Sequence, residues 1–193
     1  MTLEKNRKEE IIRLAAKLFK EKGYRAVTMR DLAETMGIKA ASLYNHIRSK
    51  QEILALIVIS TAESFTTHID EIYPKQMSSV EKLKKIIHMH VDITVQKTDF
   101  LASMNHDWMH LEKKQLVYFL KMRTSYEAKF NKIILDGIQK EELKKHDSEI
   151  ILFSILTTLR TLHLWYAKKK SWSSAELKEE LTAILITGIK GKA

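Results

Sequence analysis

The chain has 193 residues, a formal net charge of +9, 45% hydrophobic and 30% charged residues, one proline and no cysteine. This composition is typical of a folded globular protein, and it excludes disordered chains, disulfide scaffolds, thiolate metal sites and cysteine nucleophiles. The charged start of the sequence and the lack of an apolar run of roughly 18 residues lead us to expect a cytoplasmic protein with no membrane partner.

Apolar spacing predicts an all-α chain of about nine helices. Apolar residues recur at helical spacing over residues 4–22, and Gly23 is a plausible end for that helix. Thr28 and Asp31 resemble a capping box at the start of a short helix, which stops at Gly37. Further helices are predicted at about 40–46, 49–70, 78–96, 99–109, 112–143, 147–169 and 173–188.

Positive charge is concentrated near the N-terminus. Residues 1–52 hold 12 Lys/Arg against 7 Asp/Glu, whereas the rest of the chain holds 21 against 17. A basic module attracts polyanions such as DNA or RNA, although a solvated lysine-rich surface would give the same count. Charge alone therefore leaves both interpretations open.

Residues 28–50 are the most informative stretch for function. Two short helices meet at Gly37, and a glycine permits the positive φ that a sharp turn between helices can require. The second of these helices begins with small residues, which would let its backbone approach the floor of a DNA major groove. This pattern predicts a helix-turn-helix, and the residues expected at DNA are Thr28, Lys39, Ala41, Ser42, Tyr44, Asn45, His46 and Lys50.

The N-terminal sequence resembles the DNA-binding domain of the TetR family. The resemblance covers about the first 55 residues, and it rests on the segments Lys22-Gly23-Tyr24 and Leu43-Tyr44 together with Thr28, Gly37 and Lys50. It implies that Thr28 touches phosphate, that Tyr44 and Lys50 clamp phosphates, and that the other residues named above face the groove. His46 stands where the family more often has an aromatic residue. Residues 1–50 are the expected DNA-binding domain and residues 51–193 the expected effector-binding and dimerisation domain.

The predicted helix over residues 147–169 is apolar on more than one side, and the last predicted helix supplies further apolar residues. A helix with so wide an apolar surface must bury two faces. The resemblance implies that this pair of helices forms a four-helix bundle with a second copy, so that a two-fold dimer would read a palindromic operator. The residues expected at this interface are Ile151, Ile155, Leu159, Leu162, Leu181 and Leu185.

Methionines and aromatic residues are frequent in the middle of the chain. Such a stripe is ordinary core in most proteins, and the resemblance favours an effector pocket instead. The expected lining is Phe100, Met104, Trp108, Met109, Phe119, Met122, Arg123, Tyr126 and Phe130. The stretch from Lys113 to Leu143 resembles effector domains of fatty-acid and acyl-CoA repressors, which implies an acyl-CoA or another apolar effector. No cofactor is expected.

Two alternatives stay open at this stage. His106 and His110 are four residues apart on one predicted helix face, where they could bind a metal in a metal-responsive regulator, but a closed site needs further ligands. His88 and His90 lie two residues apart and read as incidental. A helical protein-binding adaptor is the other alternative. An enzyme is not expected, because no nucleophile elbow, phosphate-binding glycine loop or zinc-hydrolase motif is present.

Overall fold

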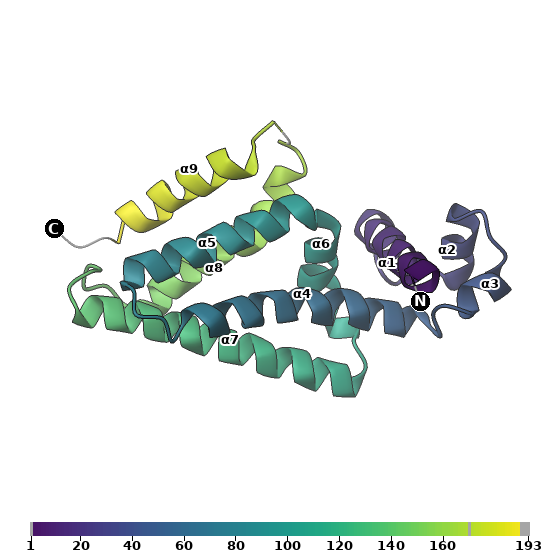
Figure 1. Ribbon diagram of the computed structural model, residues 1–193, viewed down its shortest axis with the longest axis horizontal. Coiled ribbons are helices and arrows are strands. Elements are labelled where there is room, and N and C mark those ends of the chain that lie inside the picture. Colours follow the sequence, from purple (N-terminus) through teal and green to yellow (C-terminus); the bar gives the residue numbers. More distant parts are fainter. Residues whose placement is uncertain (1, 170, 190–193) are drawn as a thin grey trace. The chain divides into compact units, whose positions relative to one another are not determined.

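The computed structural model describes residues 2–169 and 171–189. Over these ranges the chain forms nine α-helices and one short 3-10 helix, without a β-strand, which confirms the all-α prediction (Figure 1). The helices are α1 (Thr2–Lys22), α2 (Met29–Thr35), α3 (Ala40–Tyr44), α4 (Lys50–Ile72), α5 (Ser79–Gln96), α6 (Thr98–Asp107), the 3-10 helix η1 (Trp108–His110), α7 (Lys113–Gln139), α8 (Ser148–Tyr166) and α9 (Ser174–Thr187).

The chain divides into two compact units. The N-terminal unit consists of Met1–Ala62 and Asp99–Leu120, and the C-terminal unit consists of Glu63–Thr98 and Lys121–Ala193. Two long helices, α4 and α7, contribute one part to each unit. The segment with α6 and η1 thus clusters with the first three helices, although it is distant from them in sequence.

The helices α1, α2 and α3, called the reading head below, share a small apolar core. Ile11 and Phe19 of α1 are buried together with Leu32 of α2 and Leu43 of α3. The turns between these helices depend on glycine, because Gly23 and Gly37 have φ angles of +82° and +64°. These positions match the turn glycines that the sequence predicted.

Helix caps set several of the boundaries. Thr28 forms the predicted capping box with Asp31, and the same motif opens α5 at Ser78 and α9 at Ser173. Asp147 caps α8 by accepting from the backbone amides of the two residues after Ser148. Each cap satisfies amides that have no partner within the helix, which explains why these starts were visible in the sequence.

In the C-terminal unit, α5 packs against both α8 and α9 (Figure 1). Val91 of α5, Leu162 of α8 and Leu177 of α9 form one buried cluster. Along α5 the buried residues recur at helical spacing and give the helix one apolar face. This face places α5 at the centre of the unit.

Helix α7 ends at Gln139, before the boundary near residue 143 that the sequence predicted. Glu141 adopts a φ of 59°, which breaks the helix, and the chain turns back so that Leu143 packs over Gly137. A Cβ atom at Gly137 would lie 2.8 Å from both Leu143 Cδ1 and Ser79 Cβ. The turn therefore depends on a contact that sequence periodicity does not report.

Among the described helices, α4 is long and apolar enough to cross a membrane by length and composition, with a mean hydropathy of 1.2. Of the window concerned, 44% is buried inside the protein. Its buried residues include Ile53, Leu54, Ile57 and Ile69. The core helix of a folded domain meets the same criterion, so this finding is weak evidence for a membrane segment.

Candidate DNA-binding surface and buried polar cluster

Helix α3 has an apolar inner side and a small, polar outer side. Leu43 and, just beyond the helix, Ile47 are buried against the rest of the reading head. Ala41, Ser42, Tyr44 and Asn45 are exposed, with 52% of the Tyr44 surface accessible. The helix covers only Ala40–Tyr44, with Asn45 as its C-cap, so it is two residues shorter than expected. His46 follows the helix and is half-buried.

Exposed basic side chains also lie close to α3 in the sequence. Arg25, Arg30, Lys39 and Arg48 are all exposed. Across the described part of the chain, the ion pairs found do not involve any of these four side chains. Their charges can therefore attract a polyanion.

Thr28 uses its hydroxyl within the reading head. The hydroxyl donates to the Asp31 carboxylate at 2.8 Å and accepts from the Asp31 amide at 3.2 Å. The Asp31 carboxylate also accepts from the Thr28 backbone amide at 2.7 Å. The hydroxyl bond first, and then this backbone bond, lower the pKa of Asp31. Thr28 thus caps α2, as the sequence predicted, while its contact with phosphate remains a prediction.

The side chain of Lys50, at the start of α4, points toward the turn between α1 and α2. Its ammonium group donates to the carbonyl oxygens of Tyr24 at 2.9 Å and Val27 at 2.7 Å, and it lies 4.3 Å from the centroid of the Tyr24 ring. Burial lowers the pKa of Lys50, and the charge of Asp31 acts in the opposite direction. Its expected phosphate contact stays a prediction, although the side chain already has partners in the α1–α2 turn.

The nine residues expected to line an effector pocket fall into both units. Phe100, Met104, Trp108, Met109 and Phe119 belong to the N-terminal unit, and Met122, Arg123, Tyr126 and Phe130 to the C-terminal unit. Phe119, Met122, Tyr126 and Phe130 are buried. Phe100, Met104 and Trp108 are half-buried, and Met109 is 58% exposed. Trp108 stacks on Phe119 with ring centroids 5.8 Å apart. The pocket as a whole remains a prediction.

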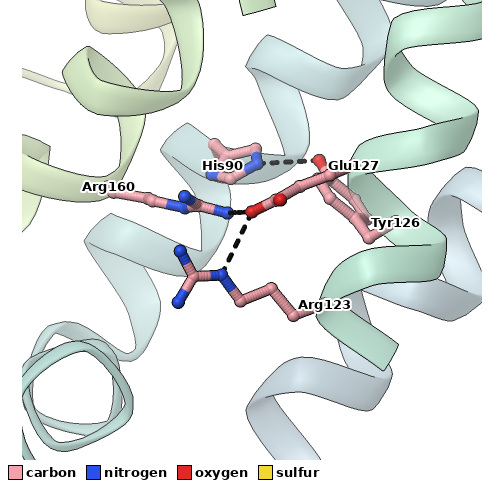
Figure 2. Close-up of polar contacts among 5 residues, drawn as sticks. All are labelled: His90, Arg123, Tyr126, Glu127 and Arg160. Carbon is pink, nitrogen blue, oxygen red and sulfur yellow. Dashed lines mark hydrogen bonds and ion pairs between the residues drawn. The ribbon is translucent and has the colours of Figure 1, made fainter. Parts of the chain in front are cut away.

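A buried polar cluster lies in the C-terminal unit between α5, α7 and α8 (Figure 2). His90 Nε2 and the Tyr126 hydroxyl form a hydrogen bond of 2.9 Å. Beside them, the Glu127 carboxylate accepts from Arg160 at 2.5 Å and from Arg123 at 3.1 Å. The cluster thus combines a neutral pair with two arginines that share one carboxylate.

The electrostatics of the cluster follow from its burial. Burial first, then the charges of Arg160 and His68, lower the pKa of His90 to about 3, so this imidazole is neutral at neutral pH. Burial also raises the pKa of Tyr126. For Glu127, burial acts to raise the pKa, but the bonds from Arg160 and Arg123 outweigh it and the pKa is lowered. The carboxylate is therefore ionised.

Sequence reasoning missed part of this cluster. His90 read as incidental, yet it is only 6% exposed and its ring lies 4.4 Å from that of Phe65. Glu127 and Arg160 were also not singled out. The available signal was the position of His90 three and four residues after Ile87 and Ile86, on the buried face of α5. Nothing in the sequence marks its pairing with Tyr126.

The residues expected at a dimer interface are largely buried within this chain. Ile151, Ile155, Leu159 and Leu162 of α8 are between 1% and 6% exposed, and Leu181 and Leu185 of α9 are half-buried. Leu181 packs against the cluster of Val91, Leu162 and Leu177. A different set of apolar side chains points outward, namely Ile150, Phe153, Leu164, Trp165 and Ile184, with exposures from 42% to 70%. The interface itself remains untested.

The metal alternative gains no support. Within the part of the chain that the structure describes, no group of three or more His, Cys, Asp and Glu side chains is arranged to hold a metal ion. His106 is exposed, and the ring of His110 stacks on Tyr24 with centroids 5.5 Å apart.

A capped three-helix head with an exposed, small-residue α3 defines a helix-turn-helix protein. Residues 11–57 match the model of the bacterial regulatory proteins of the tetR family, and residues 76–189 match the tetracyclin repressor-like C-terminal domain. The chain belongs to the TetR family. It is a DNA-binding transcriptional regulator and not an enzyme, which confirms the prediction from its first 55 residues.

Similar proteins cover nearly the whole chain. The HTH-type transcriptional repressor KstR2 of Mycolicibacterium smegmatis is 23% identical over 195 residues, with 95% of this chain and 91% of the relative covered. The structure of KstR2, the ketosteroid transcriptional regulator of Mycobacterium tuberculosis, has a TM-score of 0.90 at 21% identity, covering 96% of each chain. AibR in complex with isovaleryl coenzyme A and operator DNA has a TM-score of 0.78 at 17% identity, covering 92% of this chain and 97% of AibR. At these identities the structures show a shared fold.

Proposed function

We propose that the protein is a transcriptional repressor that binds an inverted-repeat operator as a homodimer and is released by an acyl-CoA effector. The observation that carries the DNA part is the outer side of α3, where small and polar residues are exposed, together with the exposed basic side chains of Arg25, Arg30, Lys39 and Arg48 in the same part of the chain. The curated relative KstR2 is named a repressor, which supports the same direction of regulation.

Base reading is assigned to the outer side of α3. Ser42 and Asn45 have side chains that can hydrogen-bond to base edges, Ala41 lets the backbone come close, and His46 flanks them. Tyr44 and Lys39 are assigned to phosphates. Replacement of Asn45 with alanine is expected to relax base preference at one position of each half-site, whereas Tyr44→Ala weakens binding to all sequences alike. Equal loss on every duplex for both variants would contradict this division.

Selection from a library of random 30-base-pair duplexes tests the operator proposal. The full-length protein is expected to enrich an inverted repeat whose half-site centres are about 34 Å apart, which is one turn of DNA. Binding to the selected duplex should weaken steeply between low and moderate salt, because phosphate contacts release counterions. Enrichment of no repeat, or binding that salt does not change, would contradict the proposal and favour the protein-binding adaptor.

The dimer is assigned to the outward side chains of α8 and α9. Phe153 of α8 is 70% exposed and Ile184 of α9 is 67% exposed. Several exposed apolar side chains on neighbouring helices form the kind of patch that marks a protein–protein interface. Sedimentation should show a dimer for the wild type and a monomer for Phe153→Asp. A matched control is Ser125→Asp, which adds the same charge on an exposed position of α7. A wild-type monomer at micromolar concentration would rule out the interface.

The effector is assigned to the buried polar cluster. Aromatic residues provide an apolar environment at Phe65, Tyr126 and Phe130, while Arg123 and Arg160 lie beside it and can bind anionic groups. An acyl-CoA combines both kinds of group, and AibR was solved with one. The ligand must bind the DNA-free conformation more tightly, because a ligand with equal affinity for both conformations shifts nothing.

Calorimetry with isovaleryl coenzyme A and free coenzyme A tests the effector. We expect the acyl form to bind more tightly, to release the selected duplex, and to bind more weakly to Arg160→Met. Equal binding of both ligands, or equal binding by the variant, would contradict an acyl-CoA site at this cluster. Hydrogen exchange adds a second readout, because bound ligand should change exchange in residues 28–70.

A further inference from the structure

Tyr24, in the turn after α1, contacts residues of α1, α4 and η1 in the N-terminal unit. It follows Gly23 at the end of α1, is 6% exposed, and packs edge-on against Phe19 with centroids 5.1 Å apart. The same ring stacks on His110 of η1 at 5.5 Å with an interplanar angle of 20°, and it carries the Lys50 ammonium at 4.3 Å. Tyr24 thus joins α1 to the start of α4 and to η1.

The donors of Lys50 are used inside the protein. An ammonium group has three N–H donors. Two of them bond the carbonyl oxygens of Tyr24 and Val27, and the carbonyl of Arg25 lies at 3.5 Å. Val27 directly precedes Thr28, the N-cap of α2. Lys50 therefore holds the turn that sets where α2 begins.

The segment from α6 to η1 is connected to the same place. Gln51, next to Lys50 on α4, donates from Nε2 to the carbonyl oxygen of His110 at 2.7 Å. Lys20 of α1 pairs with Asp99 of α6 at 2.8 Å. Two helices that lie far from the reading head in sequence thus contact it through an ion pair and a stacked ring.

We propose that Lys50 is a positioning residue rather than a phosphate ligand, and that Tyr24, Lys50, Gln51 and His110 form a joint that sets the angle of the reading head. The joint rests on the proposed DNA-binding function and adds a route for regulation. Movement of η1 would reach the α1–α2 turn directly through His110 and Tyr24. Conformational signals then have a path to α2 and α3 besides the shared helix α4.

Salt dependence distinguishes the two roles of Lys50. Each phosphate that a protein neutralises adds about 0.9 to the slope of log affinity against log salt concentration. A phosphate ligand therefore reduces the slope when it is removed, whereas a positioning residue lowers affinity at every salt concentration and leaves the slope unchanged.

The first experiment compares Lys50→Met with Lys39→Met in the full-length protein. Methionine keeps the length of the lysine side chain and removes its three donors. The probe is a fluorescent 30-base-pair duplex of mixed sequence, titrated over a range of salt concentrations. We expect the Lys50 variant to keep the wild-type slope and the Lys39 variant to lose about one unit of slope per protomer. A slope loss in the Lys50 variant equal to that in the Lys39 variant would overturn the proposal.

The second experiment measures hydrogen exchange without DNA. Lys50→Met and His110→Ala should speed exchange in residues 23–31 on the order of tenfold, while Lys39→Met leaves it at the wild-type rate. His110→Ala removes the ring that stacks on Tyr24 and leaves Lys50 in place, so it tests the joint even if Lys50→Met fails to fold. Unchanged exchange in His110→Ala would overturn the connection to η1. A wild type that binds no duplex would refute DNA binding, while the exchange measurement still decides the joint.

Discussion

The outer side of α3 and the buried polar cluster around His90 are assembled in opposite ways. Every residue that the sequence led us to expect at DNA lies within 23 consecutive positions, from Thr28 to Lys50. The cluster instead takes His90 from α5, Tyr126 from α7 and Arg160 from α8. A surface built from one short segment can be recognised from sequence spacing, whereas a cluster built from three helices is visible only after they pack.

The largest effect is expected from breaking the reading head at its core. Leu43 is fully buried, so Leu43→Ala should lower the free energy of unfolding by about 2–5 kcal/mol through lost transfer energy and a cavity. DNA binding should be lost, and hydrogen exchange should rise in α2 and α3. Protection in α5 and α8 should persist. Equal loss of protection in both units would show that they unfold as one.

The exposed neighbour provides the control for that change. Ser42 is exposed on the same helix, so Ser42→Ala should change the free energy of unfolding by less than about 0.5 kcal/mol. A large effect of this substitution would mean that the outer side of α3 is packed rather than open.

In the C-terminal unit, the sharpest steric test is at Gly137. Because an added Cβ would lie 2.8 Å from atoms of Leu143 and Ser79, Gly137→Ala should destabilise the protein by about 1–3 kcal/mol in thermal or denaturant unfolding. The matched control is Gly188→Ala, where the nearest atom is at 3.9 Å and φ is −60°. That substitution should be neutral or slightly stabilising. Equal effects of the two substitutions would contradict the close contact.

Titration of His90 provides a test through pH. The pKa of this histidine is about 3 in the folded protein, so between pH 6.5 and 5 only the unfolded chain takes up the proton. Stability is therefore lost as the pH falls, with a slope from this group that approaches about 1.4 kcal/mol per pH unit near pH 5. His90→Gln should flatten the slope in that window, and His146→Gln, at an exposed position, should leave it unchanged. A wild-type slope in the His90 variant would contradict a buried neutral imidazole.

The smallest effect is expected at the edge of the cluster. Arg123 is partly exposed and shares Glu127 with Arg160, which remains when Arg123 is replaced (Figure 2). Arg123→Gln should therefore cost no more than about 1 kcal/mol in unfolding. A much larger loss would show that the two arginines act as one buried network.

Several helix boundaries and turns of the fold could be predicted from the sequence, and others could not. The caps at Thr28, Ser78 and Ser173 and the glycines at 23 and 37 are local signals, and the structure places a helix boundary or a turn at each. The end of α7 was missed, because it depends on Leu143 folding back over Gly137. In the candidate sites, His90 was passed over, and the hydrogen bonds of Lys50 to the α1–α2 turn were not predicted.

The amino-acid sequence by itself determined the class of fold, the helix-turn-helix and its exposed outer side, because helix periodicity, caps and turn glycines act over a few neighbouring residues. Only the tertiary structure decided which faces of α8 and α9 are buried, that His90 meets Tyr126, and that the Lys50 ammonium binds the α1–α2 turn. Those outcomes depend on packing between different helices, where desolvation and partner geometry, rather than local propensity, set each side chain's environment; the two hydrogen bonds join residues 36 and 23 positions apart.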